Sequence, residues 1–173
     1  MAPSASILKE ALSLIETDTS KILGLTVGTH ENIQPGQFIP RDEAQPAPEM
    51  SFAGASPEKT YLVISLDTDA PFPSWTILGP IIHWVQPGVK VSGETLDITT
   101  PAFASYIGPA PPPGSAPHRY TFFLFEEPAG FEKFAPAEGP NLNTWARVRH
   151  DFDTWSKEVN LGPLLAFNYF NSN

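Results

Sequence analysis

Apolar residues near the N-terminus follow a helical spacing. Within residues 4–16 they fall at i, i+1, i+4, i+5 and i+8, on one stripe of an α-helix: Ile7, Leu8, Ala11, Leu12 and Ile15. A serine, Ser4 or Ser6, could cap the first turn. The pattern therefore predicts an amphipathic helix over residues 4–16.

Beyond residue 17 the apolar pattern changes to short runs bounded by glycine and proline, which is typical of β-strands. These runs lie at residues 22–27, 37–39, 61–66, 81–85 and 119–125. The run Tyr-Leu-Val-Ile-Ser-Leu is rich in β-branched and apolar residues, which indicates a sheet buried on both faces. A polar loop is expected over residues 40–48.

A second helix is predicted near the C-terminus, at residues 152–159, with Asp151 or Asp153 as its N-cap. A Gly-Pro pair ends this helix, and the apolar residues that follow predict a strand over residues 164–170. The overall pattern is mostly β, with helices toward the two ends of the chain.

Composition indicates short elements joined by stiff loops. Proline accounts for 20 of the 173 residues, about twice its usual share of roughly 5%. Because proline fixes φ and lacks an N–H donor, it concentrates in loops and at element ends, which argues against a helical bundle. The hydrophobic fraction of 41% argues against disorder. Without repeats or a clear boundary, residues 1–173 are expected to form a single domain.

Charge and cysteine content exclude several function classes. The net charge is −9, and no basic run is present, so we expect no nucleic-acid partner. No cysteine is present, which excludes disulfides, thiolate metal sites and cysteine nucleophiles. Lys9 and Glu10 interrupt the N-terminal apolar pattern, unlike in a signal peptide, and no apolar stretch has the length of a transmembrane segment. A cytoplasmic protein is therefore expected.

Two stretches carry most of the polar side chains that could perform chemistry. The first is Asp67-Thr-Asp-Ala-Pro71, directly after the strand predicted at residues 61–66. Asp67 and Asp69 would point the same way if that strand continued. Two interpretations stay open: an Asx-turn that satisfies loop amides, or a pair of carboxylates at a functional site.

The second stretch runs from Gly108 to Tyr120, where a proline-rich loop leads into a strand. In a strand, His118 and Tyr120 share one face while Arg119 faces the other way. Between the two stretches, His83 lies inside an apolar run. It is either a satisfied core residue or part of a site.

The order of these motifs is specific. Asp67-x-Asp-Ala-Pro71 is followed by His83-Trp84, then by Gly-Pro-x-Pro-Pro-x-Gly leading to His118-Arg-Tyr120, and finally by Asn-Leu-Gly-Pro-Leu-Leu-Ala-Phe-Asn-Tyr-Phe. Over residues 60–170 the chain resembles the phosphatidylethanolamine-binding protein (PEBP) family, in particular its divergent fungal-type members. The resemblance implies a Greek-key β-sandwich with an N-terminal helix and a short C-terminal helix. It also implies a small pocket that binds phosphate, phospholipid headgroups or carboxylates.

Carried over position by position, the resemblance names the residues of that pocket. The ligand-binding residues would be Asp67, Ala70, His83, Gly108, Pro111, Pro112, His118 and Tyr120. The residues that support them would be Asp69, Pro71, Pro80 and Arg119. Asp69 would orient a histidine. The two histidines and the tyrosine can donate hydrogen bonds to an oxyanion, and a buried aspartate would keep a histidine charged. We expect no cofactor and no metal, although Asp67, His83 and His118 could in principle hold one.

One departure from the family lies between the two stretches. Gly79-Pro80 stands where an Arg-Glu pair is common. Because a cis X-Pro bond costs only ~0.5–1 kcal/mol, we predict cis peptides at Gly79–Pro80 and Ala70–Pro71. The same loop carries four apolar side chains: Phe72, Trp75, Ile77 and Leu78. They either form an apolar pocket wall, which favours a more hydrophobic acid as ligand, or pack on the core.

Three functions follow from the resemblance. The first is a binding module for a small anion or phospholipid headgroup, with or without a protein partner. The second is an enzyme or accessory protein of natural-product biosynthesis, as for some fungal PEBP-like proteins. It would be a cofactor-free lyase, isomerase or cyclase with Asp67, His83 and His118 as acid and base. The third is a serine-protease inhibitor that acts through an exposed loop or the N-terminal segment.

Overall fold

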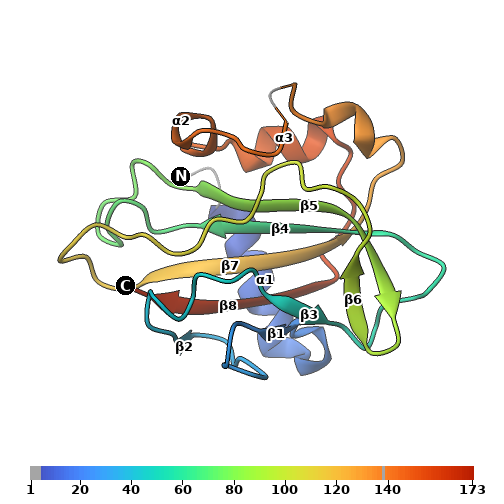
Figure 1. Cartoon of the computed structure of the whole chain (residues 1–173), viewed down its shortest axis with the longest axis horizontal. Coiled ribbons are helices and arrows are strands. Elements are labelled where there is room, and N and C mark those ends of the chain that lie inside the picture. Colours follow the sequence, from blue (N-terminus) through green and yellow to red (C-terminus); the bar gives the residue numbers. More distant parts are fainter. Residues whose placement is uncertain (1–4, 138) are drawn as a thin grey trace.

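The computed structural model describes residues 5–137 and 139–173. Its centre is a six-stranded sheet (Figure 1) with the strand order β2 (Gln37–Phe38), β8 (Ala166–Ser172), β7 (His118–Glu126), β4 (Tyr61–Asp67), β5 (Ile81–Ser92) and β6 (Thr95–Ile98). Neighbouring strands are antiparallel except for the short parallel pair β2 and β8. A second, two-stranded sheet pairs β1 (Gly24–Thr26) with β3 (Glu49–Ser51).

Helical segments surround this sheet. They are α1 (Ala5–Thr17), η1 (Thr19–Lys21), η2 (Phe131–Phe134), α2 (Thr144–Arg147) and α3 (Phe152–Glu158). In Figure 1, α1 passes behind the six-stranded sheet and the small sheet lies in front of it, while α2 and α3 lie beyond the β5 edge. Among the described residues, no helix is long and apolar enough to cross a membrane.

The large sheet is apolar on both faces because both faces are covered. Side chains alternate along a strand, so Phe122 and Leu124 of β7 pack in the cluster beneath β1 and β3. Phe123 and Phe125 pack in the second cluster, with α1 and α3. Every residue of β4 is buried. The expectation of a mostly-β fold with a doubly buried central strand is therefore confirmed.

Most predicted elements are present, with differences at their ends. Asp151 caps α3 by accepting a hydrogen bond from the Thr154 amide, 3.0 Å away. Ser6 is not the cap of α1: it lies inside that helix, and its hydroxyl donates to Asp153. Ser4 lies outside the described residues. The pattern missed the described elements β3, β6, α2, η1 and η2, each of only three or four residues.

Three strand termini meet at one end of the large sheet. Because β4 is antiparallel to both neighbours, its last residue, Asp67, pairs with Ile81 at the start of β5 and with Tyr120 near the start of β7. The loops over residues 68–80 and 105–117 extend from this end, on the left in Figure 1. This arrangement brings together the two stretches that the sequence singled out.

Candidate functional site

A cavity of about 260 Å³ lies at this end of the sheet. It is lined by all eight residues that were expected to bind a ligand: Asp67, Ala70, His83, Gly108, Pro111, Pro112, His118 and Tyr120. Further lining residues are Pro71, Leu78, Ile81, Ile107, Ala110 and Thr144. Residues separated by up to 77 positions, Asp67 to Thr144, thus share one cavity.

A charged pair, His118 and Asp67, forms part of the cavity wall. Nδ1 of the fully buried His118 donates to Asp67 Oδ2 over 2.8 Å. Its Nε2 lies 2.9 Å from Ser115 Oγ, which in turn donates to the Ala116 carbonyl. Burial alone would lower the pKa of His118, but the hydrogen bond and negative charge of Asp67 outweigh it and raise that pKa. Because the Ser115 hydroxyl already donates to Ala116, Nε2 must donate to it, as Nδ1 donates to Asp67. His118 is therefore an imidazolium whose two N–H groups are both occupied.

This pairing corrects one expectation about His118. Because both of its N–H groups bond within the protein, it contributes charge to the cavity and no free donor. The contacts follow the order of a Ser-His-Asp triad, but Ser115 does not line the cavity. Sequence reasoning missed Ser115. Ser115 precedes His118 by only three residues, which could have indicated a contact. The contact itself depends on how the loop turns between the two residues.

The two carboxylates of the Asp67 motif have different partners. Asp67 Oδ1 accepts from the Asp69 amide over 2.9 Å, which is an Asx-turn. Asp69 accepts hydrogen bonds from the backbone amide and the guanidinium of Arg119. The Arg119 N and Nε atoms each lie 2.8 Å from Asp69 Oδ2. The carboxylates would share one direction only if the strand continued; β4 ends at Asp67 and the chain turns, so the Asx-turn interpretation is the one that the structure has. The expectation that Asp69 orients a histidine was wrong, because Asp69 bonds to Arg119. Asp67 both closes the turn and orients His118.

His83 is a neutral imidazole at the cavity. Its Nδ1 lies 2.7 Å from the Ile107 carbonyl. A carbonyl only accepts hydrogen bonds, so Nδ1 carries the proton. Burial lowers the pKa of His83; the negative charge of Asp67 opposes this shift, and the positive charges of Arg147 and His118 add to it. Nε2 is therefore an unprotonated acceptor, and it makes no hydrogen bond within residues 5–137 and 139–173.

Tyr120 brings a buried hydroxyl to the same cavity. Its ring packs edge-on against His83, with centroids 5.0 Å apart, and stacks on Phe170 at 5.6 Å. In the described part of the chain the hydroxyl has no hydrogen-bond partner, although the Ala110 amide lies near enough to offset part of its pKa shift. Burial, followed by the charge of Asp67, raises the pKa of Tyr120. The hydroxyl therefore stays protonated and remains a free donor.

A buried arginine lies behind His83. Arg147, at the end of α2, is 3% exposed and donates to the Leu142 and Ile82 carbonyls at 3.0 and 3.3 Å. It forms no ion pair with any described residue. Burial lowers its pKa, but a guanidinium stays charged at neutral pH. Sequence reasoning missed Arg147, because nothing in a four-residue helix signals that its last side chain turns inward.

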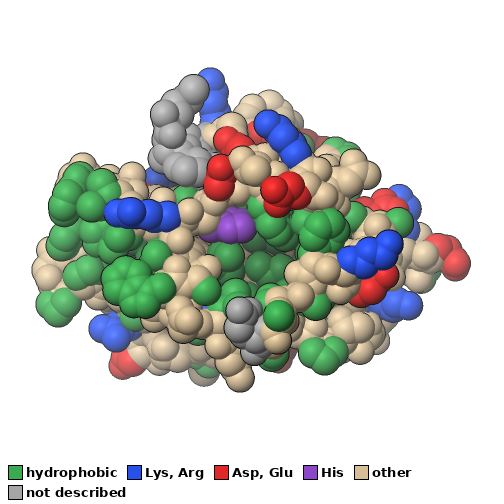
Figure 2. Space-filling view, turned by 90° about the horizontal axis from the view of Figure 1, so that it is seen from above, with side chains coloured by type: hydrophobic (Ala, Val, Ile, Leu, Met, Phe, Trp, Pro, Cys, Tyr) green, Lys and Arg blue, Asp and Glu red, His purple; other side chains and the backbone are tan. Residues whose placement is uncertain are grey.

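The loop over residues 68–80 forms an apolar rim. Both predicted cis peptides, at Ala70–Pro71 and Gly79–Pro80, are present. Leu78 lines the cavity, while Trp75 and Ile77 are 59% and 45% exposed. Hydrophobic side chains also gather at the left end of Figure 2, the end at which β4 terminates in Figure 1. Trp75, Ile77 and Leu78 therefore belong to the rim of the cavity and not to the core.

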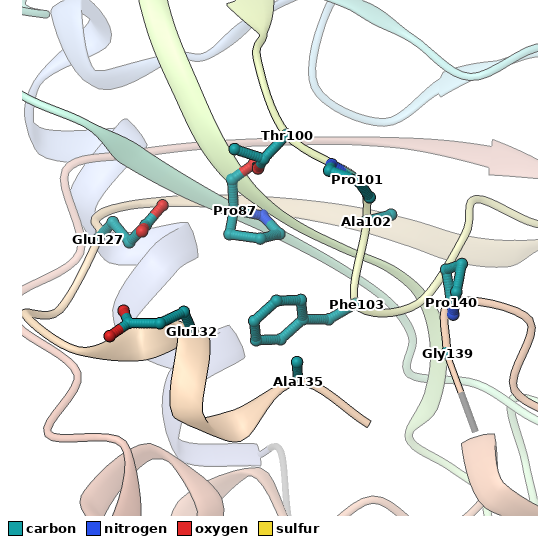
Figure 3. Close-up of a pocket in the computed structure, with 10 residues that line it drawn as sticks. All are labelled: Pro87, Thr100, Pro101, Ala102, Phe103, Glu127, Glu132, Ala135, Gly139 and Pro140. Carbon is teal, nitrogen blue, oxygen red and sulfur yellow. The ribbon is translucent and has the colours of Figure 1, made fainter. Parts of the chain in front are cut away.

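Two other cavities have different chemistry. One, of about 350 Å³ (Figure 3), holds the ring of Phe103 at its centre with Glu127 and Glu132 on one side. The other, about 100 Å³, is apolar except for His150, whose pKa burial lowers. Within the described residues, no three His, Cys, Asp or Glu side chains are arranged to hold a metal ion.

Sequence comparisons connect residues 29–170 with a family model described as phosphatidylethanolamine-binding protein. A protein of Talaromyces stipitatus, "Phomoidride biosynthesis cluster protein N", is 32% identical over 166 residues, covering 86% of this chain and 82% of that protein. The "Carboxypeptidase Y inhibitor" of Saccharomyces cerevisiae is 27% identical, covering 95% of this chain and 89% of the inhibitor. Both of these relatives are fungal.

Solved structures share the fold. Carboxypeptidase Y inhibitor, in the crystal structure of its complex with the cognate proteinase, superposes with a TM-score of 0.75 at 23% identity, covering 99% of this chain and 94% of the inhibitor. A phosphatidylethanolamine-binding protein from Plasmodium vivax gives a TM-score of 0.70 at 16% identity, covering 100% and 97% of the two chains.

Proposed function

Because the chain belongs to the phosphatidylethanolamine-binding protein family, we propose that it binds a small anionic ligand in the cavity at Asp67, His83, His118 and Tyr120. Phosphate, a phospholipid headgroup and a carboxylate share the required chemistry. One observation carries the proposal: the Tyr120 hydroxyl is buried without a partner beside an unbonded His83 Nε2. Unpaired buried polar groups are costly, and a bound oxyanion supplies the missing acceptor for Tyr120.

The charges around the cavity support an anion. Asp67 is neutralised by His118, and Asp69 by Arg119. Arg147 has no carboxylate partner among the described residues, so its positive charge is left over. A buried unpaired charge is strongly unfavourable. Arg147 does not line the cavity, but its charge acts on His83, so an anion beside His83 offsets part of it.

A thermal-shift screen tests this proposal. Inorganic phosphate, phenyl phosphate, glycerophosphoethanolamine and phenylsuccinate represent the candidate chemistries. A ligand at ~100 times its Kd adds ~2.7 kcal/mol of apparent stability. We expect at least one of these anions to raise the Tm of the wild type and to raise that of Tyr120→Phe less. No shift with any of them would contradict the proposal.

A second function is supported by the apolar rim and by the relative named as a biosynthesis cluster protein. Here the same cavity would act on a hydrophobic acid without a cofactor. Nε2 of His83 is unprotonated and suits a general base, while the His118 imidazolium and the Tyr120 hydroxyl stabilise negative charge on an enolate or carboxylate. Since both N–H groups of His118 are occupied, the base role goes to His83.

Deuterium exchange distinguishes this enzymatic function from binding alone. Phenylsuccinate and related alkyl di-acids are incubated with the protein in D2O, and exchange of the C–H next to the carboxylate is followed by NMR. Catalysis predicts exchange that His83→Gln abolishes and Tyr120→Phe only slows. Binding without exchange for every di-acid tested supports the binding module.

A third function, protease inhibition, rests on similarity to the carboxypeptidase Y inhibitor. Trp145, at 82% exposure, is a candidate contact for a protein partner. Inhibition that is lost in Trp145→Ser but retained in Tyr120→Phe would assign this activity to the surface. An absence of inhibition by the wild type would exclude it for the proteases tested.

A further inference from the structure

The two unpaired polar groups of the cavity have opposite hydrogen-bonding character. Nε2 of His83 only accepts, because the proton of the neutral ring lies on Nδ1 and is bonded to the Ile107 carbonyl. The Tyr120 hydroxyl is free to donate. The two rings contact each other edge to face, so one small ligand can reach both. The complementary ligand therefore has an O–H group as well as an acceptor oxygen.

The charges facing His83 set the charge that this ligand can carry. The groups near His83 are the Asp67 carboxylate from β4 and the His118 imidazolium and neutral Tyr120 from β7. The Arg147 guanidinium from α2 also acts on it. The Asp67 and His118 charges cancel, which leaves Arg147 as the single buried positive charge; Arg41, whose charge also acts on Tyr120, is exposed and screened by solvent. One negative charge on the ligand balances it. A second would face Asp67 and the lone pair of His83.

We propose that the cavity binds its oxyacid ligand as a monoanion that retains one acidic proton, held between a ligand oxygen and His83 Nε2, while another ligand oxygen accepts from Tyr120. This inference rests on the proposed anion-binding function. When the free ligand is fully ionised, the proton comes from solvent. Phosphate monoesters and half-ionised di-acids meet the requirement. The phosphodiester of an intact phospholipid headgroup does not, because it has no acidic proton near neutral pH.

Proton-linked calorimetry tests the proposal with two probes of similar shape. Phenyl phosphate has a second pKa near 6, whereas phenyl sulfate has no proton to offer. Titrations between pH 6 and 8 in two buffers of different ionisation enthalpy count the protons taken up. For phenyl phosphate we expect about one proton per ligand at pH 8, and a Kd that rises about tenfold between pH 7 and 8. Phenyl sulfate and glycerophosphoethanolamine should bind at least about tenfold more weakly at pH 6.

Two variants separate the roles of the donor and the acceptor. His83→Gln replaces the ring by an amide that can rotate to donate to a dianion, so the pH dependence of the phenyl phosphate Kd should flatten. Tyr120→Phe removes only the donor, so it should weaken binding about tenfold while the proton uptake stays near one. Thermal melts of both variants verify that they are folded at the titration temperature.

The outcomes distinguish this inference from the function on which it rests. Equal affinities for phenyl phosphate and phenyl sulfate, or a Kd for phenyl phosphate that does not change between pH 7 and 8, would overturn the inference and leave anion binding intact. Unchanged proton uptake in His83→Gln would also overturn it. If no probe binds at any pH, the proposed function itself fails.

Discussion

Removing the Tyr120 hydroxyl should stabilise the ligand-free protein. Tyrosine-to-phenylalanine changes usually remove a useful hydrogen bond, but this hydroxyl has no partner among the described residues and its ring is 1% exposed. Phenylalanine keeps the ring contacts with His83 and Phe170. The substitution therefore removes only the desolvation cost of an unsatisfied group, which is about 1–3 kcal/mol.

We expect Tyr120→Phe to raise the free energy of unfolding by about 1 kcal/mol. This is the lower end of that range, because the nearby Ala110 amide partly compensates the hydroxyl. For a chain of this size that corresponds to a Tm increase of about 2–4 °C. Urea unfolding in an anion-free buffer measures the change as a shift of the midpoint at constant m-value.

Tyr61 provides a matched control. It is also buried, at 2% exposure, but its hydroxyl accepts from the Ser56 amide over 2.6 Å. Tyr61→Phe leaves that amide unpaired and should destabilise the protein by about 1–2 kcal/mol. The two substitutions are chemically identical and should have opposite signs. A loss of stability in Tyr120→Phe as large as that in Tyr61→Phe would refute the reasoning, because it would mean that the Tyr120 hydroxyl is satisfied in the free protein.

Three further predictions concern His118 in the cavity wall and two groups close to it, Asp69 and Ser115. Asp69→Ala breaks the ion pair between buried Asp69 and partly exposed Arg119 and should cost about 2 kcal/mol in urea unfolding, because solvent hydrates part of the guanidinium that remains; an unchanged free energy of unfolding would contradict the pairing. Because the folded-state pKa of His118 is raised, its stabilisation is complete below the unfolded value of about 6.5 and is lost as pH rises through the folded pKa. Melts between pH 6 and 9 should show this decline in the wild type and not in His118→Asn; equal slopes would disprove it. Ser115→Ala removes the acceptor of His118 Nε2–H, so NMR titration should show a lower His118 pKa, whereas an unchanged value would assign the shift to Asp67 alone.

Much of the candidate site was predictable because its residues lie at strand ends and in proline-rich loops. Alternation in β7 placed His118 and Tyr120 on one face, and the cavity contains both. Whether His83 was a core or a site residue stayed open in the sequence. It is both, since the side chain is buried and also lines the cavity.

Periodicity and composition by themselves determined the mostly-β class, the central buried strand and the N-terminal helix, and the order of the motifs, through the family resemblance, named eight of the residues that line the cavity. These features depend on spacing within a segment, or on motifs that the family shares. Only the tertiary structure decided which partner each charged group has. The Asp67 bond to His118 spans 51 residues, and the Arg147 bond to Ile82 spans 65. Such contacts depend on where β4 ends and how α2 packs, so the protonation of His118, the tautomer of His83 and the unpaired hydroxyl of Tyr120 arise only in the folded protein.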